Sequence, residues 1–478
     1  MPPHPPDPKF HPSRSLTCPI HRLPSEVLAE IFAVCLRCFT STFEDDLASP
    51  SFETELERVA GITLLKLSRV CSRWHTIALG TSFLWSEIRL HRVLWDVEHV
   101  RDRDTVLGLI ESSLKRGGNC SLTVDIHHLG GMAPDGRVLD VLAAHSARWR
   151  NVVFLCPQSL FGRIAGLQGN LSRLHALEIR LWQSDGSALN MLESLPSLRH
   201  FSFDGPLTIL SKLAVEGLLI FEYLDVSFDK VVPAMSLLPR FGSSTEFRLD
   251  LSMANFTDRD LPHVASDICG FQILVNYVFL ASTCKAALGA VFSALTLPHL
   301  QTLRMLSDEY NIDRSYPLPW PHAQFLALCS RSSLDAHLRS LIMYDVHITA
   351  PELLECLAAL PSLECLTISD HQPTPRGGVD EHLITDALLD ALTLKPESSE
   401  SPRLVPRLRD FRFQSLMRFS DTLHLALLLS RVEAVCPFQS LIMTLPGHER
   451  NLEPDVVRQL NELARQGKLV FPEPHEYS

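Results

Sequence analysis

The sequence has little that would direct it to nucleic acid or to the cell exterior. Its 43 lysines and arginines are outnumbered by 55 aspartates and glutamates, which gives a formal net charge of −12. A chain with this balance lacks the basic stripe of nucleic-acid-binding proteins, so we predict no nucleic-acid partner. The first residues, MPPHPPDPKFHPSRS, contain no apolar run of the kind that a secretory signal needs.

Long hydrophobic runs are also scarce. The most apolar stretch, residues 271–297, is interrupted by Gln272, Asn276 and Lys285. A membrane-spanning helix needs about 20 predominantly apolar residues. We therefore predict a buried strand followed by a buried helix in this stretch, and no association with a membrane.

Cysteine is present without the spacing of a disulfide framework. The 12 cysteines are scattered over 478 residues, which is typical of small buried apolar side chains in a reducing compartment, cytoplasmic or nuclear. Cys35 and Cys38 form a C-x-x-C pair that Cys71 and His75 could complete as a zinc site. The pair lies at the end of an apolar helical pattern, so packing is the favoured interpretation, and we predict neither a metal nor a cofactor.

Motifs for catalysis are likewise lacking. Gly467 and Lys468 precede Leu469 and not the serine or threonine of a phosphate-binding loop. There is no paired-histidine zinc helix and no G-x-S-x-G elbow. We predict a protein that is not an enzyme, with a Cys–His pair in the C-terminal part as the open alternative.

What the sequence does contain is apolar residues in abundance, 46% of the chain, enough for two or three domains. Seven prolines among residues 1–20 predict a disordered tail. Residues 39–58 carry six carboxylates against one arginine and predict an acidic insert. We expect a short tail again at 471–478.

Between the tail and residue 92, helical patterns dominate. In HRLPSEVLAEIF, an apolar face begins at Leu23 and repeats at offsets of 4, 5, 8 and 9. Pro24 suits a first helical turn, and Glu26 favours its positive end. A second pattern places Leu67, Val70, Cys71 and Trp74 at offsets of 0, 3, 4 and 7, again as one helix face. A module this small seldom folds unaided, so part of its apolar surface is expected to contact a partner.

From about residue 149 a six-residue pattern recurs: apolar, two variable, apolar, one variable, apolar. The first four copies begin 25, 24 and 23 residues apart, the length of a leucine-rich repeat. The copies are WRNVVF (149–154), LHALEI (174–179), LRHFSF (198–203), FEYLDV (221–226), LQTLRM (300–305), LRSLIM (338–343), LECLTI (363–368), LRDFRF (408–413) and FQSLIM (438–443).

Each copy ends in the alternation of a half-buried strand, and several follow a helical run that a proline ends, as in SALNMLESLPSLRHF and TAPELLECLAALPSLECL. Thr349 and Pro351 have the character of a helix start. Units this small must stack to bury their apolar faces, which predicts a solenoid. An ordinary α/β domain whose strands begin alike is the alternative.

Two family resemblances follow from these residues. LPSEVLAEIF, LSRVCSRWHTIA and LWSEIRL resemble an F-box, and the segment that follows resembles degenerate leucine-rich repeats. The repeats depart from the family because they lack its asparagine or cysteine ladder. The box departs from it by an insert of about residues 36–60, familiar in F-box families of mushroom-forming fungi. The box matches are Leu23, Pro24, Glu26, Ile31, Phe32, Val70, Cys71, Trp74, Leu84 and Trp85.

The resemblance implies an adaptor-docking subunit of a cullin–RING (SCF-type) ubiquitin ligase. Its F-box would bind a Skp-family adaptor and, through it, a cullin, while the repeats bind a target protein. The alternatives are a repeat scaffold outside any ligase, and a module whose apolar residues fill only its own core. The residues that the resemblance assigns to the adaptor are Leu23, Pro24, Val27, Leu28, Ile31, Phe32, Val70, Cys71 and Trp74.

The predicted fold is therefore α/β: a small all-helical F-box-like module at 21–92, then an irregular leucine-rich-repeat solenoid at 93–470. Target-binding side chains are expected where exposed positions alternate with the strand leucines. They are His175, Glu178, Arg180, Arg199, His200, Arg339, Glu364, Arg409 and Arg412.

Overall fold

The computed structural model of the chain divides into two compact units, residues 1–174 and 175–478. The predicted N-terminal tail up to residue 18, the acidic insert from residue 42 onward and the C-terminal tail lie outside the described residues. Those described are 19–41, 60–90, 100–128, 136–164, 167, 170–181, 189–227, 230–252, 261–276, 281–307, 318–369, 383–395, 404–415, 417–434, 438–444 and 452–470.

The first unit begins with short helices, as the periodicity predicted. A 3-10 turn, η1 (Pro19–Arg22), precedes α1 (Ser25–Ser41). Then come α3 (Ala60–Leu67), α4 (Ser72–Gly80) and the 3-10 turn η2 (Ser82–Trp85).

The prediction of an all-helical module is wrong at its end, where β1 (Glu87–Leu90) is a strand. Ile88 and Leu90 are buried and alternate with less buried neighbours, a two-residue period that suits a strand. β1 pairs in parallel with β2 (Leu122–His127), so this strand depends on residues beyond the helices.

The remainder of the first unit continues as strands joined by helices. α5 (Val100–Arg116) connects β1 to β2, and α6 (Gly136–Ala143) with the turn η4 (Ser146–Arg148) connects β2 to β3 (Trp149–Leu155). β2 and β3 are parallel, and the turn η5 (Gln158–Arg163) follows.

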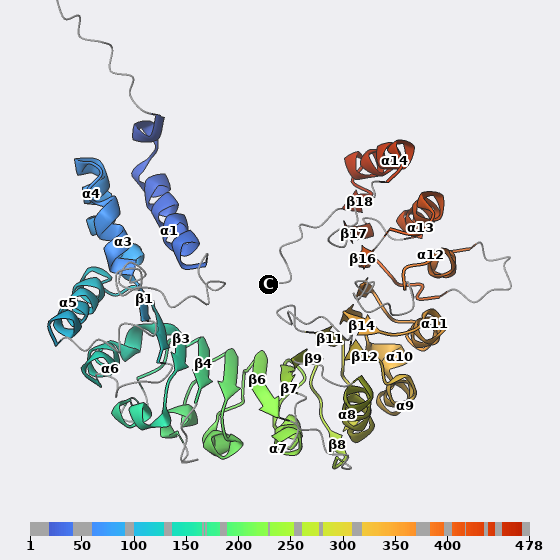
Figure 1. The fold of residues 1–478 in the computed structure, drawn as a ribbon, viewed down its shortest axis with the longest axis horizontal. Helices are drawn as coiled ribbons and strands as arrows, with labels where there is room; N and C mark the ends of the chain where they lie inside the picture. The colour runs from blue at the N-terminus through green and yellow to red at the C-terminus, as the bar shows by residue number, and fades with distance from the viewer. Residues whose placement is uncertain are drawn as a thin grey trace, which may run out of the picture. The chain divides into compact units, whose positions relative to one another are not determined.

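The second unit is built on a parallel sheet whose strands neighbour one another in chain order (Figure 1). All nine recurring patterns lie at strands, β3 in the first unit and eight here. Four strands were not predicted from the sequence: β1, β2, β7 and β18. The sheet contains β4 (Ala176–Arg180), β5 (His200–Asp204), β6 (Ile220–Ser227), β7 (Glu246–Ser252), β9 (Gly270–Asn276), β11 (Thr302–Ser307), β13 (Ser340–Tyr344), β15 (Cys365–Ser369), β16 (Asp410–Ser415), β17 (Phe438–Thr444) and β18 (Leu469–Val470).

Helices and turns of this unit connect successive strands, and α8, α9, α11, α12 and α13 lie along one face of the sheet (Figure 1). Two small parallel pairs, β8 (Val264–Ala265) with β10 (Leu295–Thr296) and β12 (Leu318–Pro319) with β14 (Val346–His347), lie among them. The connections are η7 (Asn190–Glu193), η8 (Leu207–Lys212), α7 (Val231–Met235), η10 (Leu238–Arg240), α8 (Ala281–Ala294), α9 (His322–Ser332), α10 (Leu334–His337), α11 (Ala350–Ala358), α12 (Asp386–Leu392), α13 (Asp421–Ala434) and α14 (Pro454–Arg465).

Two local predictions are confirmed and one is wrong. The buried strand and helix predicted within residues 271–297 are β9 and α8, and among the described residues no helix is both long and apolar enough to cross a bilayer. Thr349 caps α11 in a reciprocal capping box with Glu352. Where a helix was expected before β5, the described residues form the four-residue 3-10 turn η7.

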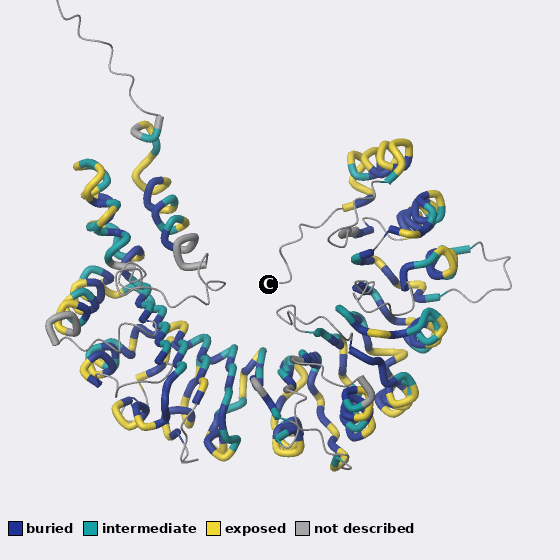
Figure 2. Tube along the Cα trace, viewed as in Figure 1, coloured by how far each residue is buried: buried dark blue, intermediate teal, exposed yellow. Residues whose placement is uncertain are grey.

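A row of phenylalanines forms the centre of the second unit's core. Phe201, Phe221, Phe247 and Phe271 occupy the same register on β5, β6, β7 and β9, and all four are fully buried. Their neighbouring ring centroids lie 5.9, 5.2 and 6.4 Å apart. Because side chains alternate along a strand, the residues on either side of each phenylalanine belong to the opposite face of the sheet. Figure 2 shows the strands coloured mainly as buried or intermediate and the exposed colour concentrated on the connecting helices and turns.

Candidate functional site

Helix α1 separates its side chains into a buried and an exposed set. The chain enters it through Pro24, whose carbonyl accepts a 3.1 Å hydrogen bond from Leu28 N–H. Leu28, Phe32 and Leu36, at intervals of four, are at most 8% exposed. Leu28 and Phe32, both assigned to the adaptor by the resemblance, therefore lie in the module's own core.

That core joins α1 to the helices downstream. Leu28 and Phe32 belong to one cluster with Leu64 of α3, Ile77 of α4 and Trp85 of η2. Trp85 is 1% exposed and donates its indole N–H to Ala78 O at 2.7 Å, which satisfies its only polar group. The guanidinium of Arg116, from α5, lies 4.6 Å from the centre of the Trp85 ring.

Trp74 lies at the edge of this core. Its ring centroid is 4.9 Å from that of Phe32, and the side chain is only partly buried. Leu23 is partly buried too, and its carbonyl accepts a hydrogen bond from Arg73, which ties the entry of α1 to α4. Leu23 and Trp74 thus each present part of their surface to solvent.

The exposed apolar residues of the module form a second set. Val27 is 43% and Val34 49% exposed, and with the half-buried Ile31 they lie at i, i+4 and i+7 along α1. Pro24 is exposed as well. Helix α1 therefore carries an exposed apolar strip, Val27, Ile31 and Val34, beside its buried one.

Val70 does not share a helix face with Trp74, so that prediction is wrong. α3 ends at Leu67 and α4 begins at Ser72, with Cys71 extended between them at φ −160° and ψ 168°. Ser68, Arg69 and Val70 close α3 in a turn through backbone bonds to residues three and four earlier. The turn leaves Val70 60% exposed at its tip, while Cys71 is half-buried.

Two further exposed apolar residues were not anticipated. Val34 follows Val27 by seven residues, a spacing that places both valines on the same face of a helix and could have predicted it. Phe83, 43% exposed in η2, has no periodic signal because it lies in a four-residue 3-10 turn. Both extend the apolar surface of the module.

For Cys35, Cys38, Cys71 and His75 the sequence favoured packing over a zinc site. No group of three or more histidine, cysteine or acidic side chains that could hold a metal occurs in the described part of the chain. Cys35 is half-buried in α1, and the side chain of Cys38 lies outside the described residues.

The second unit does bring a cysteine, a histidine and a glutamate together. The Cys356 sulfur lies 3.6 Å from His322 Nδ1, and His322 Nε2 lies 2.8 Å from Glu355 Oε2. Cys356 is fully buried, and burial raises the pKa of its thiol to about 12. A nucleophile needs the thiolate and access to a substrate, and this sulfur has neither.

The side chains predicted to bind a target belong to residues on the strands or immediately before them. Most are half-buried, with Arg180 and Arg409 exposed. Arg412 is the exception, because it is 9% exposed and held by Asp410 at 2.8 Å. Burial, His175 and Arg248 together lower the pKa of His200.

Comparison with known families and proteins bears only on the N-terminal part. A family described as F-box-like matches residues 20–91, which span η1 to β1 and include every residue assigned to the adaptor. No curated protein matches the chain. The match supports an F-box protein, and F-box domains in general bind Skp1-type adaptors.

Proposed function

We propose that this protein is the substrate-recognition subunit of an SCF-type ubiquitin ligase, acting inside the cell. The observation that carries the proposal is the coincidence of the F-box-like match with a helical module that leaves apolar side chains in solvent. Apolar side chains on a helix face are what a partner's groove accepts. The Skp-family adaptor would cover them, and a cullin would join through the adaptor.

The residues assigned to the adaptor would divide into two roles. Val27, Ile31 and Val70, with Pro24 and the exposed parts of Leu23 and Trp74, would contact the adaptor directly. Leu28 and Phe32 would act through the core that holds α1 in place, with Cys71 setting the break between α3 and α4.

The second unit would select the target. Parallel strands in chain order, each preceded by a helix or turn, support an irregular leucine-rich-repeat solenoid of the kind seen in fungal F-box-like proteins. Solenoids present a strand face for binding, and here that face carries polar and charged side chains.

The protein itself would be non-catalytic. The burial of the Cys356 thiol supports this, because it removes the nucleophile of the Cys356–His322–Glu355 set. The rate of ubiquitin transfer would rise because a bound target meets the charged ubiquitin carrier at high effective concentration.

The exposed valines provide the test. We expect Val27→Glu with Val70→Glu to weaken binding to a Skp-family adaptor at least 30-fold, about 2 kcal/mol, since each change places a charge in an apolar interface. The two proteins would be co-expressed, separated by size-exclusion chromatography and titrated by calorimetry.

A matched control is Val457→Glu, which places the same charge on a valine of α14 that is 39% exposed. It should leave adaptor binding unchanged. An adaptor complex that survives the double change would contradict the proposal, provided that the circular dichroism of both variants matches that of the native chain.

A non-ligase scaffold remains the second candidate, and the same preparation separates it from the first. Adding a cullin to the adaptor complex should give a ternary complex. A stable adaptor complex that excludes the cullin would instead favour the scaffold.

A further inference from the structure

An acid–apolar–arginine tripeptide recurs on the strands. In the second unit it is Glu178-Ile179-Arg180 on β4, Glu246-Phe247-Arg248 on β7 and Asp410-Phe411-Arg412 on β16. The central residue is buried in each case, so the acid and the arginine share the opposite face of the strand. They form ion pairs at 2.6, 2.7 and 2.8 Å.

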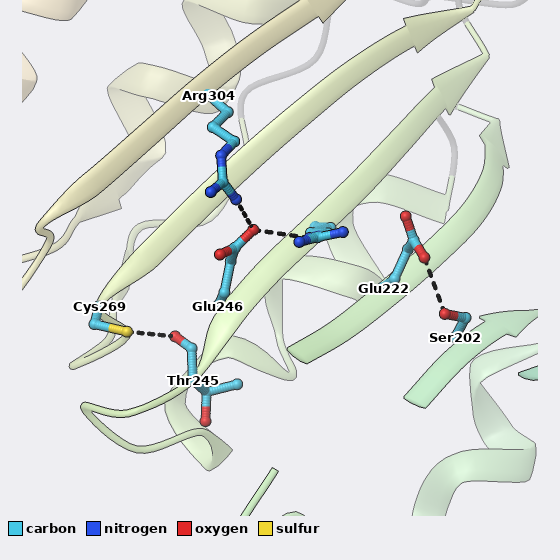
Figure 3. A network of polar contacts seen from close by, with 7 residues as sticks. Ser202, Glu222, Thr245, Glu246, Cys269 and Arg304 are labelled. Atoms are coloured by element: carbon cyan, nitrogen blue, oxygen red, sulfur yellow. Dashed lines mark hydrogen bonds and ion pairs between the residues drawn. The ribbon is translucent and has the colours of Figure 1, made fainter. Parts of the chain in front are cut away.

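At β7 a second arginine joins the pair. Arg304, from β11, bonds the same Glu246 oxygen that Arg248 bonds, so two guanidinium groups share one carboxylate (Figure 3). β9 lies between β7 and β11, so the contact spans an intervening strand.

A glycine makes that span possible. Gly270 of β9 is the register partner of Glu246, and a Cβ at this position would lie 2.8 Å from Glu246 Cγ. A side chain there would displace the glutamate, so Gly270 provides the space across which Glu246 meets Arg304.

A second set, again of one glutamate and two arginines, lies further along the sheet. Glu364 receives Arg339 at 3.0 Å on one carboxylate oxygen and Arg409 at 2.6 Å on the other. These residues come immediately before β15, β13 and β16, at the amino-terminal ends of adjacent strands.

Counted over its own three side chains, each set has a net charge of +1; Glu222 of β6, the register partner of Arg248, lies beside the first set and accepts a hydrogen bond from Ser202 at 2.9 Å. One carboxylate and two guanidinium groups sum to +1, because arginine stays protonated at neutral pH. In the first set Glu246, Arg248 and Arg304 are 18%, 28% and 29% exposed, and Arg409 in the second is 60% exposed. By contrast, the pairs on β4 and β16 are neutral.

We propose that the two sets form a recognition site for an acidic peptide segment of the target. This proposal rests on the proposed function of the second unit and specifies its target chemistry. An anionic side chain would bind between the two guanidinium groups of each set, whose remaining N–H groups suit a carboxylate or phosphoryl oxygen. Charge complementarity selects this occupant, since a basic segment would be repelled at both sets.

The sheet sets the spacing of the two anions. The first set is centred on β9 and the second on β15, three strand intervals apart, or about 14 Å at 4.8 Å per interval. An extended peptide advances about 3.4 Å per residue. The two acidic residues should therefore stand about four positions apart.

A displayed library of random 16-residue peptides would test both the charge and the spacing. Selection on the full chain, with counter-selection on Arg304→Gln/Arg409→Gln, should enrich sequences with two acidic residues about four apart. A selected peptide should bind the variant at least tenfold more weakly, and replacing its two acids with Gln or Asn should have a similar effect.

The matched control is Arg458→Gln, which removes an arginine from an exposed ion pair on α14 and should not change peptide affinity. Because Arg409 is 60% exposed, Arg409→Gln alone keeps the test valid if the double variant is unstable. Enriched peptides that lack the acidic pair, or no enrichment over the variant, would overturn the proposal.

A selected peptide resynthesised with phosphoserine at its two acidic positions would show whether the target's anion is a phosphate or a carboxylate. Tighter binding than glutamate identifies a phosphorylated segment, and equal or weaker binding identifies a carboxylate one. The adaptor titration uses different residues in a different unit, so failure of the peptide selection leaves that result intact, and the reverse also holds.

Discussion

At the scale of single residues, burial has a clear effect on the titration of His424. It is fully buried in α13, and its ring centroid lies 5.7 Å from those of both Phe413 and Phe419. Neither ring nitrogen has a hydrogen-bond partner among the described residues. Desolvation lowers its pKa from 6.5 to about 4, against the opposing effect of Asp421.

This shift predicts a loss of stability in acid. Between pH 6.5 and pH 4 the unfolded chain binds a proton at His424 that the folded chain does not, so the free energy of unfolding falls by up to about 3 kcal/mol as pH decreases. Urea denaturation at pH 7 and pH 4.5 should show it. His424→Leu should remove most of the difference, and equal acid sensitivity of both chains would contradict the assignment.

At the scale of elements, arginines join successive helices. Arg148, Arg240, Arg331 and Arg431 each stand in or at the end of a helix or turn, and donate to carbonyls near the end of an earlier one. Unpaired carbonyls and the negative end of the dipole make a helix C-terminus a favourable place for a guanidinium. These contacts link successive helices and turns in a chain whose sequence lacks the asparagine ladder of leucine-rich repeats.

Arg431 gives the strongest test of this device. It is fully buried and bonds Leu392 O at 2.9 Å, Val405 O at 2.8 Å and Leu404 O at 3.1 Å. Burial lowers its pKa to about 10, so it remains charged at neutral pH. Arg431→Met should leave these carbonyls unsatisfied and reduce the free energy of unfolding by about 3 kcal/mol.

Arg458→Met is the matched control, because its ion pair with Asp455 is more than 70% exposed on both sides. A pair this exposed contributes little to stability, so its loss should change the melting temperature only slightly. If the two variants melt alike, the buried contacts of Arg431 do not stabilise the fold as argued.

At the scale of the whole molecule, strand β1 makes the folding of the helical module depend on residues beyond position 92. Ile88 and Leu90 are buried, and β1 pairs with β2 beyond residue 92. A fragment of residues 1–92 would expose this strand edge and the face of Trp85 that Arg116 covers. We expect cooperative thermal unfolding for residues 1–174 but not for 1–92; equal cooperativity by circular dichroism would show that the helices suffice.

The six-residue pattern predicts nine of the strands; it is also complete at WSEIRL (85–90), which contains β1 and which we had assigned to the helical module. β2 and β7 alternate as well as the others, but the leading apolar position is Asn119 before β2 and Ser244 before β7. Both strands form because their neighbours supply the pairing, which depends on contacts distant in sequence.

The candidate site was predictable in composition but not in arrangement. The apolar positions at 27, 28, 31 and 32 follow from periodicity, but periodicity cannot show which of two adjacent valine and leucine residues a later helix covers. α3 and α4 cover Leu28 and leave Val27 in solvent.

The sequence by itself determined the elements: helical patterns before residue 86, short alternating strands after 149, and the residue types of an F-box. These depend on local periodicity and backbone preference, which neighbouring residues dictate. Tertiary structure alone decided the burial of Leu28 beside an exposed Val27, the sharing of Glu246 between Arg248 and Arg304 across Gly270, and the burial of Arg412. Each depends on residues that are distant in sequence and become neighbours only when the chain has folded.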